Sequence, residues 1–142
     1  MINFKASNFK GDCFIDEDFK PYLDKMNTVL INHNMVCIVT SSFRKDTNVK
    51  GAIVKPAAMS NHLVGHGIDF NLLKKDTNEY FNSTKLGDGH GDDEVCLRDI
   101  VKVSNLTWGQ TFNHPDSVHL ADQLNINNPE KWKELYNKYH GQ

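Results

Sequence analysis

The sequence predicts a fold of the α+β class, with helices and strands both present within 142 residues. Three observations carry this prediction. A helical pattern near the start of the chain runs directly into an apolar strand, an alternating strand follows at 68–72, and a capped helix closes the chain. No repeat or shift in composition marks a second domain, so we expect residues 1–142 to form a single domain.

The first predicted helix begins at the acidic run from Asp16 to Asp18 and ends near 32–34. Acidic side chains at a helix start complement the positive end of the helix dipole, and Pro21 falls early enough to be tolerated in a first turn. The apolar residues recur at helical spacing: Phe19, Leu23, Met26 and Leu30. Residues 35–40 form a short apolar run rich in β-branched side chains, which predicts a buried strand.

The middle of the chain predicts a second strand between polar loops. Residues 45–50 are typical of a loop and 68–72 of a strand, whereas 74–93 is polar and glycine-rich and predicts a long surface excursion. A helix over 94–101 follows. The residues expected to turn partly inward are Val95, Leu97, Ile100 and Val101.

The last third predicts two short strands, at 106–109 and 117–120, and a final helix. Asn128 would cap that helix and Pro129 would occupy its first turn. Its apolar stripe consists of Trp132, Leu135, Tyr136 and Tyr139.

The composition is that of an ordinary soluble globular protein, with 39% apolar and 10% aromatic residues. No window approaches the roughly 18 apolar residues of a membrane span, so we expect no membrane insertion. With a net charge of −2 and only two arginines, the chain lacks the basic stripe that binds nucleic acid. The start of the chain lacks the apolar core of a secretory signal. Three unpaired cysteines predict reduced thiols in the core.

A candidate metal site starts from His62 and Asp69, which lie seven residues apart with two glycines between them. On spacing alone such a pair is more often a structural hydrogen bond than half of a metal site. Downstream, however, Asp116 and His119 offer a further ligand and a spare carboxylate. Two imidazoles and one carboxylate leave an open position on zinc, and a neighbouring carboxylate can accept a proton, as metal-assisted hydrolysis requires.

These residues lie in three ordered motifs. The segment 60–69 has the form S-x-H-x-x-G-x-G-x-D, the pair Trp108-Gly109 precedes D-x-x-H at 116–119, and 40–44 reads Thr-Ser-Ser-Phe-Arg. Together they resemble the signatures of the M15 zinc peptidases, which cleave peptidoglycan stem peptides, and the D-x-x-H form is similar to that family's endolysin branch. The resemblance implies a small central antiparallel sheet flanked by helices, the Hedgehog/DD-peptidase-like fold, with zinc on the cleft side of the sheet.

The resemblance also implies roles for single residues. His62, Asp69 and His119 would hold Zn²⁺, and Asp116 would be the general base. Arg44 would stabilise the oxyanion or hold a substrate carboxylate, a task suited to its fixed fork of donors. Ser60 would be a hydrogen-bonding residue near the metal or the substrate.

Two features depart from the family pattern. Gly67 stands where the family usually has alanine, and the polar excursion around Gly87 to Asp93 does not resemble the family segment expected there. The role of the whole segment 74–93 and the substrate preference are therefore left open. Among the other histidines, His114 is a candidate for contact with the substrate or the base. For His66 a solvated or core-satisfied position is favoured over a functional one. The histidines expected at the surface are His33, His90 and His140.

The sequence therefore predicts a zinc metallopeptidase acting on a peptidoglycan stem peptide. An L-alanyl-D-glutamate endopeptidase is favoured, a D-alanyl-D-alanine carboxypeptidase comes next, and a non-catalytic zinc-containing binding module of the same fold is the alternative. A cysteine protease is disfavoured, because Cys37 lies in an apolar strand where a thiolate is disfavoured. We expect a monomer that stays in the cytoplasm until release and then acts on the cell wall, although a cytoplasmic enzyme that handles wall fragments fits equally.

Overall fold

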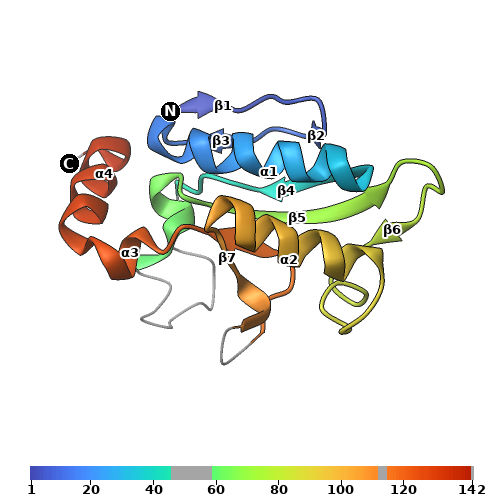
Figure 1. Ribbon diagram of the computed structural model, residues 1–142. Coiled ribbons are helices and arrows are strands. Elements are labelled where there is room, and N and C mark those ends of the chain that lie inside the picture. The colour runs from blue at the N-terminus through green and yellow to red at the C-terminus, as the bar shows by residue number, and fades with distance from the viewer. Residues whose placement is uncertain (46–58, 112–114, 142) are drawn as a thin grey trace.

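The computed structural model describes residues 1–45, 59–111 and 115–141. It is a mixed α+β structure in which two helices lie side by side over one face of a sheet, and a further helix stands at one end (Figure 1). The strands are β1 (Ile2–Asn3), β2 (Phe9–Lys10), β3 (Phe14–Ile15), β4 (Met35–Ser41), β5 (Gly67–Lys74), β6 (Tyr80–Phe81), β7 (Thr107–Trp108) and β8 (His119–Ala121). The helices are α1 (Lys20–His33), α2 (Asp92–Ser104), α3 (Leu124–Asn127) and α4 (Pro129–His140), with short 3₁₀ turns η1 (Glu17–Phe19), η3 (Asn61–Val64) and η4 (Gly109–Thr111).

The main sheet has the strand order β2-β4-β5-β8-β7, with β6 paired to β5. The pairings of β4, β5, β6, β7 and β8 are antiparallel, as the family resemblance implied. The antiparallel prediction is wrong for β2, which runs parallel to β4. This strand and the small β1–β3 ladder come from the first fifteen residues, where two-residue strands leave no periodicity for a sequence pattern to show.

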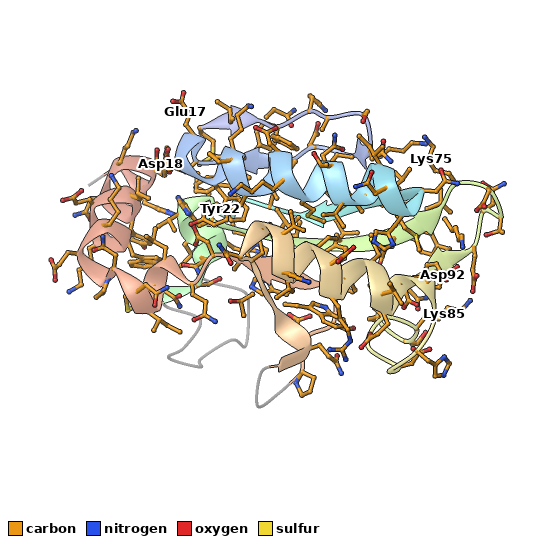
Figure 2. All side chains as sticks on the ribbon, in the orientation of Figure 1. Glu17, Asp18, Tyr22, Lys75, Lys85 and Asp92 are labelled. Carbon is orange, nitrogen blue, oxygen red and sulfur yellow. The ribbon has the colours of Figure 1, made fainter. Side chains whose placement is uncertain are left out.

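The predicted helix at the start of the chain is confirmed, but it is built in two parts. Asp16 caps η1 by accepting a hydrogen bond from the backbone N–H of Asp18, and α1 follows with Pro21 in its first turn. Figure 2 shows Glu17 and Asp18 at the end of α1 that lies towards α4, whereas Lys85 and Asp92 lie at the opposite end of the molecule. The inward face of α1 carries the predicted stripe, buried as Leu23, Met26 and Leu30.

The predicted strands at 35–40 and 68–72 are confirmed as β4 and β5, each slightly longer than its apolar pattern. The core lies between this sheet and the helices α1 and α2. In β5, Ile68 and Phe70 are buried in that core, so the alternation of side chains along a strand turns Asp69 to the opposite face. The site residue is thereby placed away from the helical layer.

The helix predicted over 94–101 is α2 and extends from Asp92 to Ser104. Leu97 and Ile100 are buried as expected, but the inward prediction is wrong for Val95, which is 57% exposed. A helix turns about 100° per residue, so Val95 lies roughly opposite Leu97 and cannot share its face.

The polar segment 74–93 is only partly the surface excursion that its composition predicts. β6 pairs with β5 inside it, and Phe81 and Leu86 are buried. The strands predicted at 106–109 and 117–120 are present as β7 and β8, and the final helix is α4, capped by Asn128 as expected. The loop predicted at 45–50 falls almost wholly outside the described residues.

The three cysteines are buried thiols, as predicted. Burial raises the pKa of Cys13 and of Cys96 to about 12, and it holds the pKa of Cys37 well above its ordinary value. These thiols therefore stay protonated and unreactive at neutral pH. In the described part of the chain, no helix combines the length and the apolar character that crossing a membrane requires.

Candidate metal centre

His62 is presented by the short turn η3, and the residue is 3% exposed. The ring Nδ1 lies 2.7 Å from the backbone carbonyl of Ser42. A carbonyl oxygen can only accept, so Nδ1 carries the hydrogen and Nε2 is the nitrogen left to bind a metal. Ser42 was not identified from the sequence, because its contribution is a backbone atom.

Asp69 lies at the centre of the site. Its Oδ1 is 3.1 Å from His62 Nε2 and 3.2 Å from His119 Nδ1. Burial alone would raise the pKa of Asp69, but the hydrogen bonds and charges of His119 and His62 outweigh it and hold that pKa well below its ordinary value. The carboxylate is therefore ionised, as a metal ligand must be.

His119 is the first residue of β8 and is the direct cross-strand partner of Asp69 on β5. Its ring lies beside that of His62, with the centroids 5.1 Å apart. The sequence places these residues in separate motifs, and the pairing of β5 with β8 brings them together. All three predicted ligands thus meet on one face of the sheet.

The donor set fits zinc. Within residues 1–45, 59–111 and 115–141, His62, Asp69 and His119 form the one group of metal-binding side chains whose ligand atoms all lie within 4.8 Å of one another. Ligand atoms about 2.0–2.1 Å from a tetrahedral zinc are about 3.3 Å apart, close to the two observed separations. Two imidazole nitrogens, one carboxylate oxygen and an open fourth position are the composition of a catalytic zinc site.

Arg44 reaches the same carboxylate from the end of β4. A register shift between Val39 and Ser41 marks a β-bulge there, and bulges re-aim the side chains that follow them. The guanidinium donates to Asp69 Oδ2 at 2.8 Å and to Ser41 Oγ at 3.0 Å. Arg44 is 42% exposed in its side chain, so it also faces the solvent side of the site.

Asp116 and His119 occupy the first and last positions of a hydrogen-bonded turn, in which His119 N–H donates to the Asp116 carbonyl at 3.2 Å. The Asp116 side chain is exposed. Its backbone N–H donates to the carbonyl of Gly109 at 2.9 Å. A side chain at Gly109 would begin 2.3 Å from the Asp116 carbonyl oxygen, so only glycine allows this approach.

Trp108 and the polar segment 74–93 contact the turn formed by residues 116–119 and the residues beside it. The indole N–H of Trp108 donates to the Ser117 carbonyl at 2.7 Å, and its ring is buried. Ser117 Oγ donates to the Ser83 carbonyl, and the Gln110 side chain donates to the Gly87 carbonyl. The polar segment 74–93 therefore packs against the loop that carries Asp116.

Ser60 caps the turn that carries His62. Its hydroxyl accepts a hydrogen bond from the backbone N–H of His62, and its carbonyl accepts one from the indole of Trp132. These contacts hold η3 in place. A contact between Ser60 and substrate stays a prediction, and His114 lies outside the described residues.

The other histidines of the described residues lie in different environments. His66 is buried between two carboxylates, in the core-satisfied position favoured above. His90 is exposed as expected. His33 is half-buried against Asp99, and His140 is half-buried with its Nε2 donating to the Leu63 carbonyl, so the surface prediction is wrong for both. Their partners lie 66 and 77 residues away, beyond the reach of a local pattern.

Comparison with known proteins agrees with this geometry. A family model described as D-alanyl-D-alanine carboxypeptidase (Peptidase_M15_4) matches residues 54–122, a range that includes all three candidate ligands and Asp116. No curated protein matches the chain. Together with the ordered motifs and the assembled donor set, this match supports an M15 family peptidase.

Proposed function

We propose that this protein is a zinc-dependent peptidase that cleaves a peptide bond in the stem peptides of peptidoglycan. The cluster of His62, Asp69 and His119 is the observation that carries the proposal, because it offers zinc three ligands and leaves one position open. The family match supports a peptidase and a peptidoglycan-related substrate. The proposal includes the Hedgehog/DD-peptidase-like fold, formed by residues 1–142 as one domain.

Zinc in such a site lowers the pKa of water to about 7 and polarises the carbonyl that is attacked. His62 would bind through Nε2, because its Nδ1 is committed to the Ser42 carbonyl. His119 would bind through Nδ1, the nitrogen that faces Asp69. The carboxylate of Asp69 would supply the third ligand.

Asp116 is proposed as the general base. The hydrogen-bonded turn sets it three residues before His119, on the approach to the metal-binding strand. An exposed carboxylate can take a proton from the attacking water and return it to the leaving amine. Gly109 and Trp108 hold the turn from which this carboxylate extends.

Arg44 is proposed to stabilise the oxyanion or to bind a substrate carboxylate. In the structure its guanidinium holds Asp69 Oδ2. Arginine has five donors in a planar fork, so it can keep one contact with Asp69 and still present donors to a substrate oxygen. Ser60 and His114 remain proposed contacts on the substrate side.

The bond we favour is L-alanyl-D-glutamate, followed by D-alanyl-D-alanine. The observation behind this choice is the D-x-x-H form of the second motif, which Asp116 and His119 carry. We further propose that the enzyme acts as a monomer on the cell wall after release from the cytoplasm, in the manner of an endolysin.

Digestion of purified peptidoglycan followed by mass spectrometry of the new termini tests the proposal. We expect new D-glutamate amino termini, and new D-alanine carboxyl termini would instead identify the carboxypeptidase. The Asp116→Ala variant serves as the control, with zinc retained and cleavage reduced by at least about 10²-fold.

The alternative is a zinc-containing binding module without hydrolysis. It would be supported if the wild-type protein bound cell-wall fragments and zinc but released no new termini. Full activity after removal of all metal by chelation would contradict the proposed zinc chemistry itself.

A further inference from the structure

His66 lies between the proposed ligands His62 and Asp69 along the chain but has no part in the chemistry described above. Its ring Nδ1 is 2.6 Å from Asp122 Oδ2, and its Nε2 is 2.8 Å from Asp16 Oδ2. Both nitrogens face carboxylate oxygens, so both donate and the ring carries a positive charge. All three side chains are 4–6% exposed. The protein thus buries a cation between two anions.

Burying three charges is costly, and apolar side chains of similar volume would fill the space without that cost. Ionic groups kept in a core are best attested where they fix the register of neighbouring elements. The charges around His66 also influence its titration. Burial alone would lower the pKa of His66, but the hydrogen bonds and charges of Asp122 and Asp16 outweigh it and raise that pKa.

The position of His66 in the sheet suggests which register is fixed. The pairing of β5 with β8 runs from Asp69 opposite His119 to Gly67 opposite Ala121. His66 and Asp122 are the next residues on each chain, so their ion pair closes the end of the ladder next to Gly67. A slip of one residue would send Asp69 and His119 to opposite faces of the sheet.

Asp16 connects the His66–Asp122 ion pair to the N-terminal segment and to α4. Its backbone N–H donates to the Gly65 carbonyl at 3.0 Å, and its Oδ1 accepts a hydrogen bond from the Tyr139 hydroxyl of α4. Figure 2 shows Tyr22 near the start of α1, and burial, followed by the charge of Asp122, raises the pKa of that tyrosine. The two carboxylates that hold His66 therefore come from the N-terminal segment and from the residue after β8, and Asp16 links them to α4.

We propose that His66 is a positioning residue that, held between Asp16 and Asp122, keeps β5 and β8 in the register that brings Asp69 and His119 onto one metal ion. Through the same contacts it couples the N-terminal segment and α4 to the metal centre. The inference deepens the proposed function and rests on it for the metal-binding readout.

The test compares His66→Gln with His33→Gln. The control removes a histidine–aspartate pair of similar length, in which His33 Nε2 lies 2.7 Å from Asp99 Oδ2. This pair joins α1 to α2 and includes none of the proposed metal ligands. We expect His66→Gln to weaken zinc binding by about 10- to 100-fold, the range found for partners that orient metal ligands. Zinc affinity is measured by competition with a chelator under conditions where circular dichroism shows both variants folded.

Amide hydrogen exchange in the metal-free protein provides a second readout. The amides of Ile68 and Leu120 should exchange faster in His66→Gln and at the wild-type rate in His33→Gln. Wild-type zinc affinity and wild-type exchange in His66→Gln would overturn the proposal. A wild-type protein that binds no zinc would contradict the proposed function, while the exchange rates would still test the register.

Asp122→Asn is the second variant. It keeps an oxygen that accepts from His66 Nδ1 but removes one charge, so we expect a smaller loss of zinc affinity, about three- to tenfold. If His66→Gln does not fold, the zinc affinity of Asp122→Asn tests the positioning role instead. If neither variant folds while His33→Gln does, the network is purely structural and the positioning role is overturned.

Discussion

Asp69 and His119 face each other directly across β5 and β8, with Asp69 Oδ1 3.2 Å from His119 Nδ1. The same carboxylate oxygen is 3.1 Å from His62 Nε2. Asp69 is therefore the residue through which the two motifs meet. Substitutions at this carboxylate should affect metal binding before they affect the fold.

Asp69→Asn should lose zinc while it keeps the shape of the site. The amide retains an oxygen for hydrogen bonds but no negative charge to neutralise the dication, so we expect affinity to fall by more than the roughly 100-fold typical of outer partners. Metal analysis after dialysis against a weak chelator measures this. Asp99→Asn is the matched control and should retain zinc. One tightly held zinc per chain in Asp69→Asn would show that Asp69 is not a ligand.

Gly65→Ala should be far more destabilising than Gly141→Ala. Both glycines end a helical turn with positive φ, 73° and 76°. A Cβ at Gly65 would lie 2.4 Å from the Asp16 nitrogen, whereas one at Gly141 meets nothing within 4 Å. We expect a loss of about 1 kcal/mol at Gly141 and about 3 kcal/mol or more at Gly65. Urea unfolding of the two variants measures the difference, and equal losses would refute the close approach of Asp16.

Gly109→Ala should impair turnover more than zinc binding. The new Cβ would meet the Asp116 carbonyl oxygen at 2.3 Å and displace the turn that carries the proposed base. A displacement of about 1 Å can cost about 10²-fold in rate. Turnover of a muropeptide and zinc affinity are measured together. Gly89→Ala is the control, because a Cβ there meets nothing within 4 Å and only its positive φ of 94° is strained. Wild-type turnover in Gly109→Ala would contradict the role of this contact.

The metal-free protein should lose the stability that His66 contributes as the pH rises through the raised pKa of that residue. The pKa of His66 is raised from 6.5 on folding, so its ion pairs contribute fully below pH 6.5 and are lost as the pH rises through the folded value. The pKa of Asp16 is instead lowered from 3.8, because hydrogen bonds from Tyr139 and His66 outweigh burial, which alone would raise it. Its contribution is present above pH 3.8 and is lost on acidification through the lowered value.

Thermal unfolding of the metal-free protein across this pH range measures both effects. The decline on the alkaline side should be smaller in His66→Gln than in the wild type, because the variant has no imidazole to deprotonate. His33→Gln should follow the wild-type profile. An alkaline decline of the same size in His66→Gln would assign it to other groups.

Much of the fold could be predicted from local patterns. The stripe of α1, the strands β4 and β5 and the cap of α4 all follow from spacings within a dozen residues, which is the range over which helical and strand periodicity acts. Strands of two residues, such as β1 to β3, carry no such period. Their places are set by pairing with distant residues, including the parallel contact of Phe9 with Cys37.

The sequence by itself determined the types and the order of the candidate ligands and the spacing of Asp116 and His119, because these depend on residue chemistry and short spacings. Only the tertiary structure decided that Asp69 and His119 pair across two strands and that Ser42 selects the nitrogen of His62. It also decided that His66 is held by Asp16 and Asp122, which lie 50 and 56 residues away along the chain. Contacts at such separations depend on strand register and packing, and neither leaves a local signal in the sequence.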